Sequence, residues 1–186
     1  KRSAMEIARV AEQLGARLST GSSVDYSYVS VRTLKKNVDA ALELAADVLL
    51  NPWFPEAEID RVRHDRLTRI LQHRDDPSTV ASKAFLRAVY GQAHPYGFSE
   101  IGTEESNRVV TRMELEAFWQ DGYLPRNAAL VVSGDLTAEE LRVLAERHFG
   151  SWAGAGMGPE GSLPEGAPAR HVVVVDRPEL PQTVLR

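Results

Sequence analysis

A helix is predicted near the N-terminus, because apolar side chains there recur every three or four residues. Ser3 and Glu6 form a Ser-x-x-Glu capping box ahead of this stripe, and Gly15 is a natural residue just beyond a helix C-terminus. The stripe consists of Ile7, Val10, Ala11 and Leu14.

Two strands are predicted next, at residues 16–20 and 24–34, around a turn at Gly21-Ser22-Ser23. In the second strand, polar and larger side chains alternate with valine and threonine. This alternation predicts a sheet with two different faces. One face would carry Tyr28, Ser30 and Arg32, and the other Val29, Val31 and Thr33.

Three longer helices are predicted at 38–50, 55–74 and 77–90. Asn51-Pro52 ends the first, and Asp76-Pro77 separates the other two, because a residue before proline avoids the helical conformation. Pro55 and Pro77 suit the first turn of a helix. The apolar positions are Val38, Leu42, Ala45 and Leu49 in the first helix and Ile59, Val62, Ile70 and Leu71 in the second.

The remaining chain mixes loops, capped helices and short apolar runs. Residues 92–110 are expected to form an ordered loop, since His94-Pro95, Gly97 and Gly102 forbid a continuous helix. Capping boxes at Thr111/Glu114 and Thr137/Glu140 predict two more helices. Between them, Ala128–Ser133 is a candidate for a short buried strand, and Val172–Val175 is another run of strand type.

Composition divides the chain into three parts. Residues 1–152 form one unit of intermixed helices and strands, which favours an α+β fold with a largely antiparallel sheet covered by helices. Residues 153–169 are rich in glycine and proline and are predicted to be a linker between units. Residues 170–186 are expected to begin the following unit or to add a closing strand.

Charge and length exclude several classes of protein. Of the 186 residues, 43% are hydrophobic and 26% charged, as in an ordinary globular protein. The net charge of −4 gives no reason to expect nucleic acid as a partner. The absence of cysteine excludes disulfides and thiolate metal sites. No apolar run approaches the roughly 20 residues that cross a bilayer, and the start at Lys1 suggests a piece of a longer polypeptide.

The order of the turn and stop signals resembles one homologous unit of the insulinase/pitrilysin family of zinc metallopeptidases, which includes mitochondrial processing peptidase and the core proteins of the bc1 complex. The resemblance covers residues 1–152 well and 170–186 loosely, and it implies the same α+β fold. The signals are Asn51-Pro52-Trp53-Phe54, Asp76-Pro77, the segment 90–97, Gly102-Thr103, the segment 123–127, Gly134-Asp135 and the segment 149–152.

The resemblance raises the question of zinc. Active members carry a His-x-x-Glu-His motif on one helix, which the resemblance places upstream of Lys1, and a glutamate ligand on a second long helix. That second helix matches 55–74, where the ligand position falls at Arg69, or at Thr68 if the register slips by one. Neither side chain can replace the carboxylate, so we expect no catalytic residue and no metal ligand in this unit.

Other candidate sites have simpler interpretations. His64 and Asp60 share a helical face, but a solvated surface explains them. His73 and His148 lie at predicted helix C-termini and His94 lies in a predicted loop, where a structural role explains each of them. No sequence feature indicates a partner for His171. The serines lack a Gly-x-Ser-x-Gly motif, and the glycines at 154–158 lack the lysine of a phosphate loop. Trp53 and Phe54 remain candidates for an exposed docking surface.

The resemblance implies a non-catalytic unit that helps to form the peptide chamber of a zinc-dependent peptidase. Its partners would be a homologous zinc-bearing unit, in the same polypeptide or in another subunit, and a peptide substrate. The substrate-binding residues stay undetermined. The alternatives are a structural subunit like the respiratory core proteins and an active zinc endopeptidase unit with a displaced ligand. Because many bacterial relatives are exported, we also expect the periplasm or cell envelope.

Overall fold

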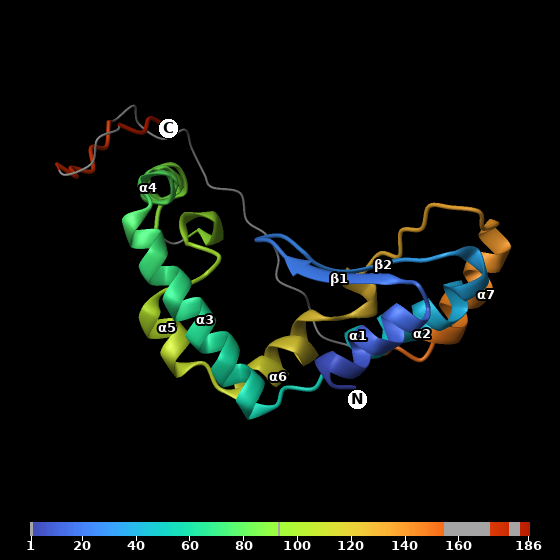
Figure 1. Ribbon diagram of the computed structural model, residues 1–186. Helices are drawn as coiled ribbons and strands as arrows, with labels where there is room; N and C mark the ends of the chain where they lie inside the picture. Colours follow the sequence, from blue (N-terminus) through green and yellow to red (C-terminus); the bar gives the residue numbers. More distant parts are fainter. Residues whose placement is uncertain (1, 93, 155–171, 179–182) are drawn as a thin grey trace. The chain divides into compact units, whose positions relative to one another are not determined.

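The computed structural model describes residues 2–92, 94–154, 172–178 and 183–186. Within these residues, helices accompany one small antiparallel sheet (Figure 1), which confirms the predicted α+β class. The chain divides into two compact units. Unit 1 comprises Lys1–Pro55 and Met113–Pro159, and unit 2 comprises Glu56–Arg112 and Glu160–Arg186. The predicted division into 1–152, 153–169 and 170–186 stays a prediction.

The sheet of unit 1 is a hairpin of β1 (Arg17–Ser22) and β2 (Ser27–Arg32). The predicted turn at 21–23 was wrong by several residues, because Gly21 and Ser22 extend β1 and the chain reverses over Ser23–Tyr26. The Ser23 amide donates to the Tyr26 carbonyl at 2.8 Å. The Ser23 hydroxyl in turn accepts from the Asp25 amide at 3.3 Å. A serine side chain thus stabilises the turn that glycine was expected to make.

The helices of unit 1 begin and end where local signals predicted. Ser3 and Glu6 form the expected capping box at α1 (Ala4–Gln13), and Gly15 follows with φ of 56°, a conformation that glycine adopts without strain. The 3₁₀ turn η1 (Lys35–Asn37) leads into α2 (Val38–Leu50), which ends at Asn51 as predicted. The later helices are α6 (Arg112–Gly122), η3 (Pro125–Asn127) and α7 (Ala138–Phe149), the last with the expected Thr137/Glu140 box.

Helix α2 forms the centre of the unit 1 core. It contacts β2, α7 and α1, and the hairpin lies along α1 and α2 (Figure 1). Burial of its apolar side supplies the main hydrophobic stabilisation of this unit. At its end, the indole Nε1 of Trp119 donates to the Leu49 carbonyl at 3.0 Å and satisfies one of the carbonyls that a helix terminus leaves open. The buried residues are Ala41, Leu42, Leu44, Ala45 and Ala46 of α2, with Ala11 and Leu124.

Unit 2 is helical within its described residues. It contains α3 (Glu56–Asp75), α4 (Pro77–Tyr90), η2 (Pro95–Gly97) and α5 (Glu104–Val109). The break at Asp76-Pro77 is confirmed, and Gly91 ends α4 with φ of 79°. The prediction of a loop over 92–110 was partly wrong, since α5 lies inside it. Thr103 and Ser106 form the capping box of α5. The third helical position holds this serine and not the glutamate by which the other capping boxes were recognised in the sequence.

Two strand predictions were wrong for the residues that the structure describes. Ala128–Ser133 pairs with no strand there, and Val131 is 87% exposed. Val172–Val175 is likewise unpaired and exposed in the described segment. An apolar run becomes a strand only when another strand offers a hydrogen-bonding edge, which the local sequence does not specify. The predicted linker lies mostly outside the described residues. No described helix is long and apolar enough to cross a membrane.

Candidate functional site

The expected ligand position lies on the exposed side of α3. Thr68 and Arg69 are both exposed, whereas the adjacent Ile70 is buried at 6% exposure. Zinc in proteins is bound by cysteine, histidine, aspartate or glutamate, and an arginine remains a cation that cannot donate an electron pair to a metal. Nowhere among the described residues do three or more such ligands gather closely enough to hold a metal. Thr68 and Arg69 therefore do not supply the carboxylate that the family's third-ligand position requires.

The neighbouring arginines of α3 have structural partners in unit 2. Arg66 Nε donates to Asn107 Oδ1 at 2.7 Å, and its NH2 donates to the Ile101 carbonyl at 2.8 Å. Arg63 NH2 donates to the Val110 carbonyl at 2.7 Å. Asn107 Nδ2 donates to the carbonyls of Ile101 and Thr103 at 2.8 and 2.7 Å. This network holds the segment around α5 against α3, so these guanidinium groups stabilise the fold of unit 2.

Within the part of the chain that the structure describes, the histidines do not form a shared metal site. Asp60 is paired with Arg63 and not with His64, which is exposed. His94 accepts from the Tyr96 amide at 3.1 Å and stacks against Tyr90, so it stabilises the loop in which it lies. The Nδ1 atom of His73 is buried without a hydrogen-bond partner in the described structure. His171 lies outside the described residues.

His148 joins α7 to α2. Its Nε2 lies 2.8 Å from Asp39 Oδ1, and Arg147 NH1 donates to the same oxygen at 2.9 Å. The hydrogen bond from His148, followed by the hydrogen bond and charge of Arg147, holds the pKa of the Asp39 carboxyl below its ordinary value. Sequence reasoning placed His148 at a helix end but could not identify this partner, which lies 109 residues away.

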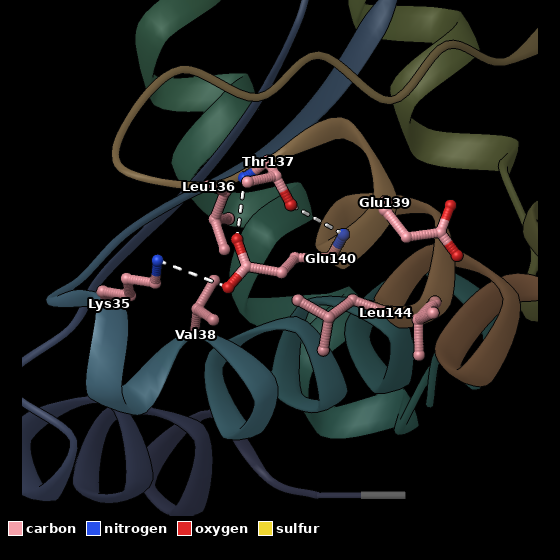
Figure 2. Close-up of a pocket in the computed structure, with 8 residues that line it drawn as sticks. Lys35, Val38, Leu136, Thr137, Glu139, Glu140 and Leu144 are labelled. Atoms are coloured by element: carbon pink, nitrogen blue, oxygen red, sulfur yellow. Dashed lines mark hydrogen bonds and ion pairs between the residues drawn. The ribbon is translucent and has the colours of Figure 1, made fainter.

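A shallow hollow lies near the start of α7, and its floor is apolar (Figure 2). Val38, Leu136 and Leu144 contribute to the floor, and Lys35 and Glu140 stand at the edge as an ion pair with an N–O distance of 3.4 Å. The Thr137 hydroxyl already accepts a hydrogen bond from the Glu140 amide as the N-cap of α7. The hollow holds no pair of groups arranged for acid, base or nucleophilic catalysis.

The outward face of the hairpin is the second surface that could bind a ligand, and sequence reasoning missed it. In the observed register, Arg17 lies opposite Arg32, Ser19 opposite Ser30 and Gly21 opposite Tyr28. Because side chains alternate along a strand, these six residues share one face. We call this set the paired-arginine face. The half-buried residues Leu18, Val29 and Val31 lie on the other face.

The other residues singled out from the sequence lie apart from any such site. Trp53 is 49% exposed, as a docking residue would be, whereas Phe54 is half-buried. Ser22 belongs to β1, and Ser23 makes the hairpin turn. Asp76 caps α4 by accepting from the Thr79 amide at 2.9 Å, so its carboxylate has a structural role.

Comparison with known proteins identifies relatives of the chain. A search of curated proteins finds an uncharacterized zinc protease of Mycobacterium leprae, 31% identical over 150 residues, which cover 81% of this chain and 34% of that protein. It also finds subunit 1 of the mitochondrial cytochrome b-c1 complex of Bos taurus, 27% identical over 143 residues, which cover 77% of this chain and 30% of that subunit. The chain thus spans about a third of the length of these relatives.

Solved structures give the same fold. A peptidase M16 inactive domain from Pseudomonas fluorescens matches with a TM-score of 0.83 and 25% identity, over 89% of this chain and 40% of that one. A protease from Helicobacter pylori, 23% identical, matches in fold with a TM-score of 0.76 over 91% of this chain and 39% of that one.

Sequence profiles assign the family. Residues 110–186 match the profile of the peptidase M16 inactive domain. Residues 1–122, well over half of the chain, match the profile of insulinase, peptidase family M16. The resemblance first indicated by the order of turn and stop signals is thereby confirmed, and the chain belongs to the insulinase family of peptidases.

Proposed function

We propose that this chain is a non-catalytic part of a zinc-dependent peptidase, where it helps to form the peptide chamber opposite a homologous zinc-bearing half. The observation that carries the proposal is the pair Thr68 and Arg69 on α3, exposed at the position where the family's third ligand is expected. A guanidinium there would repel a divalent cation. The similarity to a peptidase M16 inactive domain supports the same assignment.

Metal analysis of the full-length protein tests this proposal. We expect zinc that is lost on chelation to reside outside this chain, so Arg69→Ala and Thr68→Ala should leave the zinc content and the rate of peptide cleavage unchanged. Substitution of the zinc-binding histidines in the partner half should abolish both. Anomalous diffraction at the zinc edge that locates a metal beside α3 would contradict the proposal.

A structural subunit without any part in proteolysis is the second candidate, and the similarity to the cytochrome b-c1 subunit supports it. Cleavage of an unstructured peptide by the purified assembly separates the two. Chelator-sensitive cleavage that requires this chain favours the peptidase. An assembly that loses its integrity without this chain, but never cleaves a peptide, favours the structural role.

A further inference from the structure

We propose that the paired-arginine face binds an extended acidic peptide, with Arg17 and Arg32 together holding one carboxylate of that peptide. This inference rests on the proposed function, because it names the class of peptide that the non-catalytic half would hold. It adds a location and a chemical preference that the family assignment does not contain.

The two arginines of the paired-arginine face lack a counter-charge among the described residues. Residues directly opposite in an antiparallel pair have Cβ atoms roughly 5 Å apart, and like charges in that position destabilise the pair. Arg17 and Arg32 occupy such a pair, and both are exposed. In the described part of the chain, neither of them makes an ion pair or a side-chain hydrogen bond. By contrast, Arg61 pairs with both Glu58 and Asp65 on the surface of α3. A bound anion would neutralise the repulsion in the hairpin.

The shape of the guanidinium group selects the kind of anion that fits. A guanidinium presents a planar fork of N–H donors that matches the two oxygens of a carboxylate. Two such groups side by side can hold one carboxylate from both sides. A nucleic acid would need a long basic surface, and a chain with a net charge of −4 does not supply one. The isolated pair of charges therefore favours a single acidic side chain over a polyphosphate.

The other end of the same face carries aromatic side chains. The ring of Tyr28 lies over Gly21, where a Cβ atom would come within 2.6 Å of the ring. Tyr28 is nevertheless 46% exposed, and the more exposed Tyr26 lies at a ring-centroid distance of 6.3 Å. The two rings offer an apolar contact at one end, with the hydroxyls of Ser19 and Ser30 between them and the arginines.

The length of the face sets the spacing of the peptide. Tyr28 and Arg32 are four residues apart on β2, which corresponds to about 13 Å at the usual strand rise. An extended peptide rises at the same rate, so its acidic residue and its apolar residue should also lie about four positions apart. We therefore expect recognition of a peptide that carries glutamate or aspartate and, about four residues away, a phenylalanine or leucine.

Fluorescence anisotropy on the full-length protein provides the test. The probe is a labelled, otherwise neutral ten-residue peptide with Glu and Phe four positions apart, compared with the same peptide carrying Gln or Lys in place of Glu. We expect the Glu peptide to bind most tightly. Arg17→Gln and Arg32→Gln should each weaken its binding about fivefold, as for an exposed ion pair of about 1 kcal/mol, and added salt should reduce the difference. Arg17→Lys should retain part of the affinity.

Two controls separate binding from structure. Arg126 is an exposed arginine of the same unit without an ion pair in the described structure, so Arg126→Gln should leave peptide binding unchanged. Because Arg17 and Arg32 repel each other, Arg17→Gln should weaken binding without lowering the thermal unfolding temperature. A parallel loss of binding and stability would overturn the inference in favour of a structural role.

The outcomes also separate this inference from the proposed function. Equal binding of the Glu and Gln peptides, unaffected by the arginine substitutions, would overturn the acidic preference and leave the peptide-binding role intact. No binding of any peptide would contradict both. Preference for a single-stranded oligonucleotide over the Glu peptide would also overturn the inference, since the face would then recognise phosphate.

Discussion

The substitution Arg66→Ala tests whether the arginines of α3 hold the α5 segment in place. Arg66 makes two short contacts, with Asn107 Oδ1 at 2.7 Å and the Ile101 carbonyl at 2.8 Å, and both are partly buried. A longer contact reaches the Glu100 carbonyl at 3.4 Å. Removing the guanidinium leaves these acceptors without their charged donor, while Asn107 Nδ2 continues to donate to the Ile101 carbonyl.

The magnitude follows from the two short contacts. A hydrogen bond to a charged group contributes about 1.5–3 kcal/mol when buried, and partial exposure together with the remaining amide donor reduces the sum. We therefore expect the local opening of the segment 98–112 to become easier by about 2 kcal/mol. At 1.4 kcal/mol per factor of ten, this corresponds to roughly thirtyfold faster amide exchange.

Hydrogen exchange of the full-length protein measures this effect directly. Arg61→Ala is the matched control, because Arg61 is an arginine of the same helix whose partners, Glu58 and Asp65, are exposed carboxylates. We expect it to change the exchange of 98–112 very little. Equal acceleration by the two substitutions, or acceleration spread uniformly over the whole unit, would refute the idea that a specific network anchors this segment.

Three further outcomes are expected. Asp39→Asn should lower the free energy of unfolding fully above about pH 4 and progressively less below it. The pKa of Asp39 is lower in the folded protein than in the unfolded chain, so the stabilisation by its carboxylate is lost as the pH falls through the folded-state pKa. The melting curves of the two proteins should therefore converge in acid. Gly97→Ala should destabilise unit 2 by about 3 kcal/mol, because the new Cβ would lie 1.9 Å from the Gly91 carbonyl oxygen, whereas Gly122→Ala, with open space around it, should be tolerated in the same thermal assay. Trp119→Phe should cost at least about 1 kcal/mol in chemical unfolding, since the hydrogen bond to the Leu49 carbonyl of α2 is lost together with part of the packing of the indole.

Helix boundaries could be predicted from the sequence because their signals are local. The Ser3/Glu6 and Thr137/Glu140 boxes and the Asp76-Pro77 break each lie within four residues of the end that they define. The failures concern features that depend on distant residues. Ala128–Ser133 has a strand-like pattern, but pairing requires an edge elsewhere in the chain. The partner of His148 was similarly invisible, since Asp39 is far away in sequence.

The candidate binding face was missed for a related reason, which is the hairpin register. A turn at residues 21–23 would have placed Arg17 opposite Ser27, on the same face as Val29 and Val31, and Arg32 on the opposite face. The observed turn at 23–26 places the two arginines directly opposite each other. A register change by an odd number of residues transfers every side chain of one strand to the other face. The alternation of Tyr28 and Arg32 with valines could therefore indicate that β2 has a polar face, but it could not reveal which residues of β1 share that face. The chemistry of the surface depends on a turn that the Ser23 amide closes and the Ser23 hydroxyl stabilises. The pairing of two like charges could be recognised only once that turn was located.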